Sequence, residues 1–204
     1  MKRALTICAL AFGLAACRER PEVPEWRELV QIPDRPMVIS QRDLNTVDAI
    51  DPRDGSTIWS YYRPPLERTR WAVRPQPHVV CPITYLPVGR VVLRYHDAMH
   101  VLDVETGELL WEKAWILQRF CPVASLDSGV LTITELGTQL EKLDANGNEV
   151  WVYDFSQLGE AIAQPTVIWP TGDVLVRTRH RILAVSPTGD LNWSELHSVE
   201  GAPP

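Results

Sequence analysis

Cys81 and Cys121 are the residues of the central sequence whose chemistry is easiest to predict. Each is followed by proline, and they lie forty residues apart. In an oxidising compartment such a pair can form a disulfide, provided that the two Cα atoms approach within about 7 Å. Two buried free thiols are the alternative. A closed zinc site is disfavoured because it needs four ligands and only His78 is near in sequence.

The other residue types that support catalysis or metal binding lack a supporting pattern. His96 and His100 flank the turn "HDAMH". On a helix this spacing would bring both rings to one metal ion, but on a hairpin it does not. No Gly-rich phosphate loop is present, and no Ser-His-Asp arrangement stands out. We therefore expect no catalytic residue, no metal site and no cofactor-binding residue.

The first seventeen residues, "MKRALTICALAFGLAAC", read as a targeting segment. Lys2 and Arg3 precede the uncharged apolar run Ala4–Ala16, which is too short to span a bilayer as a helix. The end of the run, Leu14-Ala15-Ala16-Cys17, resembles the lipobox of bacterial lipoproteins. That resemblance implies cleavage before Cys17 and attachment of diacylglycerol and palmitate-type acyl chains to its thiol. An ordinary secretory signal with an incidental cysteine is the alternative.

These features predict three regions and a location. Residues 1–16 are the signal peptide, residues 17–36 a lipidated Pro-rich tether and residues 37–204 the folded domain. Arg18 follows the cysteine, which by the same resemblance implies a periplasm-facing outer-membrane lipoprotein; the inner membrane and the cell surface stay open. The formal net charge of −6 disfavours nucleic acid as a partner. The acyl chains would provide the membrane contact.

One frame of turn and strand residues occurs four times after residue 36. It has Asp, a short turn with Gly, and then Trp, at a Trp-to-Trp spacing of 52, 40 and 42 residues. A period near forty is typical of propeller blades. The four copies are "IDPRDGSTIW", "LDVETGELLW", "LDANGNEVW" and "AVSPTGDLNW", with signature residues Asp51, Gly55, Trp59, Asp103, Gly107, Trp111, Asp144, Gly147, Trp151, Gly189 and Trp193. The last copy has Val185 where we expect the Asp.

The frame has a local physical explanation. Asp bonds backbone groups two residues on, Gly supplies a positive φ, and Trp buries a large ring. Alternating apolar residues before each frame indicate further strands. We therefore predict an all-β fold, a small β-propeller of about four four-stranded antiparallel blades. Leu29–Ile32 supplies the first strand of the first blade. A closed ring is the first expectation, and an open arc completed by a partner or a second copy is the alternative.

The repeat resembles the PQQ-like β-propeller repeat, most closely in "LDVETGELLW". That family includes the propeller lipoprotein of the outer-membrane β-barrel assembly machinery, which is a non-catalytic scaffold. It also includes quinoprotein dehydrogenases, which bind pyrroloquinoline quinone and calcium. Relatives usually have seven or eight blades, whereas this sequence has four. The sequence also lacks the adjacent cysteines of the dehydrogenases. Hydrogen bonding within the turns explains its repeated Asp residues, so we predict no cofactor.

A longer connector after the first Trp is the best candidate for a partner surface. The segment Tyr61–Pro77, "YYRPPLERTRWAVRPQP", interleaves arginine with aromatic residues, a composition that favours interface centres. A solvated connector is the alternative. The candidate residues are Tyr61, Tyr62, Arg63, Arg68, Arg70, Trp71 and Arg74.

Together these features predict a membrane-anchored periplasmic scaffold for protein–protein interaction in an envelope assembly, and not an enzyme. An enzyme subunit or small-ligand binder that uses the propeller channel is one alternative. A structural subunit that needs another chain to complete its ring, and hence an oligomer, is another.

Overall fold

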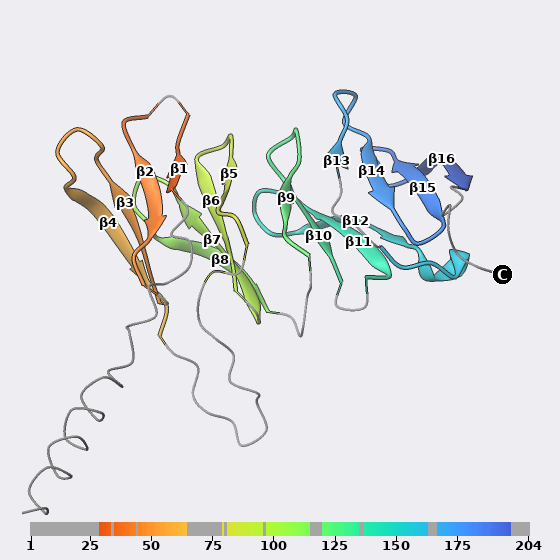
Figure 1. Ribbon diagram of the computed structural model, residues 1–204, viewed down its shortest axis with the longest axis horizontal. Coiled ribbons are helices and arrows are strands. Elements are labelled where there is room, and N and C mark those ends of the chain that lie inside the picture. The colour runs from red at the N-terminus through yellow and green to blue at the C-terminus, as the bar shows by residue number, and fades with distance from the viewer. Residues whose placement is uncertain are drawn as a thin grey trace, which may run out of the picture.

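The computed structural model describes residues 29–33, 35–43, 45–64, 79, 81–95, 97–114, 120–134, 137–162 and 167–196, and within these ranges the fold is almost entirely β-strand (Figure 1). The signal peptide, Cys17 and most of the tether lie outside these ranges. None of the described helices is long and apolar enough to cross a membrane.

Sixteen strands in the described ranges form four antiparallel sheets, each with its strands in sequence order. The expected four four-stranded blades are therefore confirmed. The first blade contains β1 (Leu29–Gln31), β2 (Val38–Gln41), β3 (Thr46–Ile50) and β4 (Thr57–Tyr62); the second β5 (Thr84–Leu86), β6 (Arg90–Arg94), β7 (Ala98–Asp103) and β8 (Leu109–Ala114); the third β9 (Val123–Ala124), β10 (Val130–Ile133), β11 (Gln139–Leu143) and β12 (Glu149–Asp154); the fourth β13 (Val167–Ile168), β14 (Val174–Arg177), β15 (Arg181–Val185) and β16 (Leu191–Leu196). A 3-10 turn, η1 (Ser156–Leu158), follows the third blade.

The strand β1 lies inside the segment 17–36 that the sequence assigns to the tether. It pairs with β2, with Val30 opposite Ile39, so it is the first strand of the first blade. The propeller therefore begins before residue 37. This pairing confirms the expectation that Leu29–Ile32 supplies the first strand of this blade.

The turn before each outer strand is built as the repeat predicts. The Asp51 carboxylate accepts the Arg53 backbone N–H at 2.9 Å, and Asp103 and Asp144 accept equivalent bonds. In the fourth blade the expectation for Val185 is wrong. Ser186 takes the role of the Asp, because its hydroxyl accepts the backbone N–H of Asp190 at 3.0 Å. A serine hydroxyl bonds the backbone in the same way as a short carboxylate, only more weakly.

The hydrophobic core lies between the blades rather than within them. Each of three clusters joins two consecutive blades: Ile39 and Val47 pack with Leu93, Met99 and Val101 with Val130, and Leu140 with Val176. A sheet of four short strands buries only one face against each neighbour, so the faces at the two ends of the stack depend on further contacts.

The four blades form an open arc. The first and fourth blades stand at opposite ends of the longest axis, with the others in order between them (Figure 1). The expectation of a closed four-bladed ring is therefore wrong, and the open arc is the correct alternative. The rotation from one blade to the next is too small for four blades to complete a circle.

Candidate interaction surfaces

Each of three repeat tryptophans is docked on the turn of the following blade. The indole N–H of Trp59 donates to the Val104 carbonyl at 2.8 Å, and that of Trp111 donates to Ala145 at 2.9 Å. Trp151 donates to the Pro187 carbonyl at 2.8 Å. In every case the acceptor is the residue directly after the Asp or Ser of the turn. We call this arrangement the Trp dock.

The turn glycine leaves room for the docked ring. A Cβ atom placed on Gly107 would lie 2.6 Å from the Trp59 ring, and one on Gly189 would lie 2.7 Å from Trp151. Both glycines also have positive φ, 72° and 93°. Only glycine meets both demands, because any other residue is strained at this φ and would displace the ring. The sequence predicts the φ but not the contact with a different blade.

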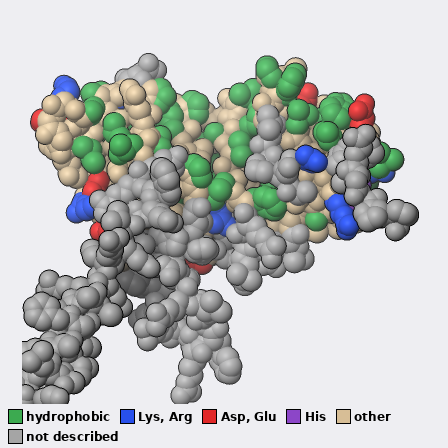
Figure 2. All heavy atoms as spheres, in the orientation of Figure 1, with side chains coloured by type: hydrophobic (Ala, Val, Ile, Leu, Met, Phe, Trp, Pro, Cys, Tyr) green, Lys and Arg blue, Asp and Glu red, His purple; other side chains and the backbone are tan. Residues whose placement is uncertain are grey.

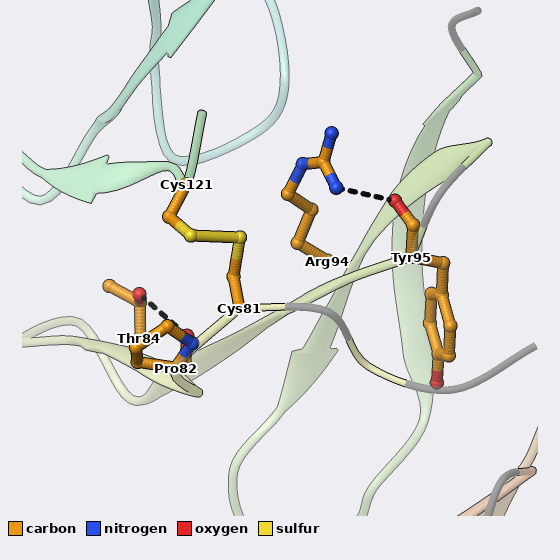
Figure 3. Close-up of a disulfide and its surroundings, with 6 residues drawn as sticks. All are labelled: Cys81, Pro82, Thr84, Arg94, Tyr95 and Cys121. Atoms are coloured by element: carbon orange, nitrogen blue, oxygen red, sulfur yellow. Dashed lines mark hydrogen bonds between the residues drawn. A yellow bond between two sulfur atoms is a disulfide. The ribbon is translucent and has the colours of Figure 1, made fainter. Parts of the chain in front are cut away.

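A disulfide joins the inner strands of the second and third blades. The sulfur atoms of Cys81 and Cys121 are bonded, with their Cα atoms 5.4 Å apart, and each cysteine lies just before an inner strand (Figure 3). The buried Arg94 lies near the bond and donates to the Tyr95 carbonyl at 3.1 Å. Burial lowers the pKa of Arg94. The bond therefore adds a covalent link to the Trp dock between these two blades.

A buried polar cluster fills the outer part of the junction between the first and second blades. Arg63, only 6% exposed, donates to the Asp97 carboxylate at 2.6 Å and lies over the Tyr95 ring at 4.2 Å from its centroid. Burial raises the pKa of Asp97, but the hydrogen bond and the charge of Arg63, with smaller contributions from the backbone and His100, together leave that pKa below its usual value. Burial raises the pKa of Tyr95. The guanidinium therefore joins two blades by charge and by ring stacking.

His100 continues this cluster as a neutral side chain. Its Nδ1 lies 2.6 Å from the Tyr61 hydroxyl, and its Nε2 lies 3.5 Å from a Glu112 carboxylate oxygen. A carboxylate only accepts, so Nε2 carries the proton and Nδ1 accepts the Tyr61 O–H. Burial, with Arg63 nearby, lowers the pKa of His100 to about 4.

Acid is therefore expected to destabilise the protein through His100. Because the folded-state pKa lies below the ordinary histidine value of 6.5, the unfolded chain binds the proton first as pH falls. The free energy of unfolding should fall by about 3 kcal/mol between pH 7 and pH 4, and be constant above pH 7 as far as this group is concerned. Denaturant titrations at several pH values measure the slope. In His100→Gln the slope between pH 6.5 and pH 5, above the range in which the Asp carboxylates titrate, should largely vanish; an unchanged slope there would contradict this role.

The predicted partner surface is only partly described, and one of its residues is buried. Tyr62 is exposed and Tyr61 is half-buried against His100. Arg63 belongs to the junction cluster and is not available to a partner, which corrects the expectation for that residue. Composition alone could not show that its guanidinium pairs with Asp97 on the next blade. Arg68, Arg70, Trp71 and Arg74 lie outside the described residues, as do His78 and His96.

A row of apolar side chains follows the tips of the inner hairpins. Val88, Leu126 and Trp169 are 52%, 63% and 53% exposed, and each lies on the turn between the first two strands of its blade. These turns lie along one edge of the arc (Figure 1), where apolar side chains gather on the surface (Figure 2). We call Val88, Leu126 and Trp169 the hairpin-tip row. Within the described ranges, no group of three or more metal-ligating side chains converges.

Four face-to-face antiparallel blades, joined by Trp docks, define a β-propeller protein of the PQQ-like type. Within this class, the chain belongs to the family described as outer membrane protein assembly factor BamB, whose model matches residues 43–200. The resemblance inferred from the repeat is therefore confirmed. A search of curated protein sequences found no match.

Solved structures share the fold at low sequence identity. BamB from Moraxella catarrhalis is 16% identical with a TM-score of 0.60, over 83% of this chain and 49% of that one. A europium-containing methanol dehydrogenase is 16% identical with a TM-score of 0.59, over 83% and 42%. A streptogramin B lyase is 15% identical with a TM-score of 0.56, over 86% and 56%. The chain thus spans about half the length of these proteins.

Proposed function

We propose that this chain is a membrane-anchored periplasmic scaffold that binds another envelope protein, with Cys17 as its lipidation site and the outer membrane as its location. Membership of the BamB family supports a role in an envelope assembly. The observation that carries the proposal is the hairpin-tip row, because it is an apolar surface that the fold itself leaves uncovered among the described residues.

The geometry of the row suits an extended apolar partner segment. Single exposed apolar residues are ordinary, but here three consecutive blades each present one on the turn of the same hairpin. Charged groups border it: Asp127 pairs with Lys142, and Asp173 accepts from Asn192 at 2.8 Å. An apolar strip with a polar rim has the composition of a protein–protein interface.

Enzymatic activity is not part of this proposal. The similarity to a dehydrogenase and a lyase concerns the fold, and a propeller hosts many functions. The repeated carboxylates of Asp51, Asp103 and Asp144 accept backbone N–H bonds in their own turns. These bonds give them a structural role that requires no substrate.

Site-specific photocrosslinking tests the scaffold role. A crosslinking amino acid at position 126 or 169 should capture an envelope protein in intact cells, and Trp169→Asp should weaken the capture at position 126 about tenfold or more. Positions 110 and 150 are matched controls, because Leu110 and Val150 are also exposed but lie on the outer strands β8 and β12. Equal capture at all four positions, or none at the tips, would contradict the proposal.

A further inference from the structure

We propose that two copies of this chain close head to tail into one ring of eight blades, with Trp193 of each copy docked on Gly55 of the other. The three internal Trp docks join four blades. The same construction leaves one tryptophan and one turn, at opposite ends of the arc, without a counterpart among the described residues (Figure 1).

Trp193 is the unused tryptophan. It occupies the dock position of the fourth blade, opposite Ala184, as Trp59 is opposite Ala49 in the first. It is nevertheless 45% exposed, whereas Trp59 and Trp151 are 8% and 9% exposed. Within the described residues, no acceptor is bonded to its indole N–H. The indole that is buried and hydrogen-bonded at Trp59 and Trp151 is therefore about half exposed to solvent at Trp193.

Gly55 belongs to the turn that has no docked tryptophan. Its φ of 75° matches the 72° of Gly107, so the two turns have the same backbone shape. A Cβ on Gly107 would meet a Trp ring at 2.6 Å, but one on Gly55 would meet nothing within 4 Å. The exposed Pro52 follows Asp51 as Val104 follows Asp103, so its carbonyl is the equivalent acceptor for a docked indole.

The outer faces of the end blades carry groups that match this junction. In the fourth blade, Ile182 and Trp193 are partly exposed on the face that the first three blades bury against a neighbour. At two of the three docks, the residue two positions after the tryptophan bonds the next blade: Tyr61 contacts His100, and Lys113 pairs with Glu141. The same step from Trp193 leads to Glu195. Its counterpart in the first blade is Asp48, which Arg42 already neutralises with a half-exposed guanidinium. The guanidinium of Arg42 can therefore also form an ion pair with the carboxylate of Glu195 from the other copy.

A second copy is the occupant that satisfies both ends at once. The chain covers 49% and 42% of the two structures with the highest fold similarity given above, so two copies together have about the length of one of those proteins. A contact between different surfaces of the same chain is heterologous, and it forms a closed ring only when the rotations sum to a full turn. Two copies whose arcs each turn through half a circle would meet this condition, and eight blades lie within the range of known propellers.

Light scattering of the full chain in detergent tests the closure. We expect twice the chain mass for the unmodified protein and the single mass for Trp193→Ala or Gly55→Asn. The dissociation constant of the dimer should rise at least about a hundredfold in each variant. Asparagine tolerates positive φ and Gly55 has open space around it, so this variant should fold. Trp169→Ala, which removes another exposed tryptophan of the fourth blade, should remain a dimer.

Mixing the two monomeric variants separates this arrangement from every other dimer. A pair made of one Trp193→Ala chain and one Gly55→Asn chain keeps one intact dock, so dimers should reappear on mixing. A monomeric parent protein, filaments of increasing length, failure to recover dimers, or a different protein bound at Trp193 would each overturn the proposal. Crosslinking from the hairpin-tip row is independent of this outcome, so the scaffold role can stand or fall separately.

Discussion

Replacement of Gly107 by alanine is expected to lower the free energy of unfolding by about 4–6 kcal/mol. The added Cβ would lie 2.6 Å from the Trp59 ring, so the ring must leave its dock. The displaced indole loses its bond to Val104 and most of its burial, which for a core tryptophan costs about 3–5 kcal/mol when the side chain is removed. Alanine at positive φ adds about 1 kcal/mol. Denaturant-induced unfolding followed by circular dichroism measures the change.

Gly159→Ala is the matched control for that variant. Gly159 has a φ of 66° and nothing within 4 Å of the position of an added Cβ, so only the backbone strain is introduced. Its cost should be about 1 kcal/mol. Equal losses for the two variants would show that the blades do not depend on the Trp dock.

Removal of the disulfide should have the second large effect. The double variant Cys81→Ser/Cys121→Ser opens a loop closed over a sequence separation of 40 residues. Chain-entropy estimates for a loop of this length give about 4 kcal/mol, and measured losses for native disulfides are about 2–5 kcal/mol. Unfolding in oxidising and reducing buffers provides the measurement.

A comparison of the two buffers also supplies the control. The reducing agent should destabilise the parent protein to the level of the double variant and leave the double variant itself unchanged. Equal stability of the parent protein in both buffers would show that the bond does not contribute to the folded state.

The blades are largely predictable from the sequence, whereas their closure is not. The frame that ends in Trp59, Trp111, Trp151 and Trp193 defines each outer hairpin, because Asp, Gly and Trp each have a local role there. The rotation angle between consecutive blades depends on side-chain volumes in the clusters around Val47, Met99 and Leu140. A repeat period carries no information on that rotation. The closed ring was therefore the wrong expectation.

The candidate surfaces show the same division. Arg63 looks like an interface residue by composition, but its partners Tyr95 and Asp97 come from the next blade, and only the fold shows that they bury it. The hairpin-tip row escapes sequence inspection because Val88 and Leu126 are unremarkable in their own turns. Alignment of the four repeats at their inner hairpins is the signal that could have placed these tips together.

Hydrogen exchange of the indole N–H groups tests the Trp dock, on which the whole architecture depends, most directly. Nuclear magnetic resonance of the protein, assigned with single Trp→Phe variants, resolves each of the eight tryptophans. The indole protons of Trp59, Trp111 and Trp151 should exchange far more slowly than that of Trp169. Exchange of those three at the rate of an exposed indole would contradict the account.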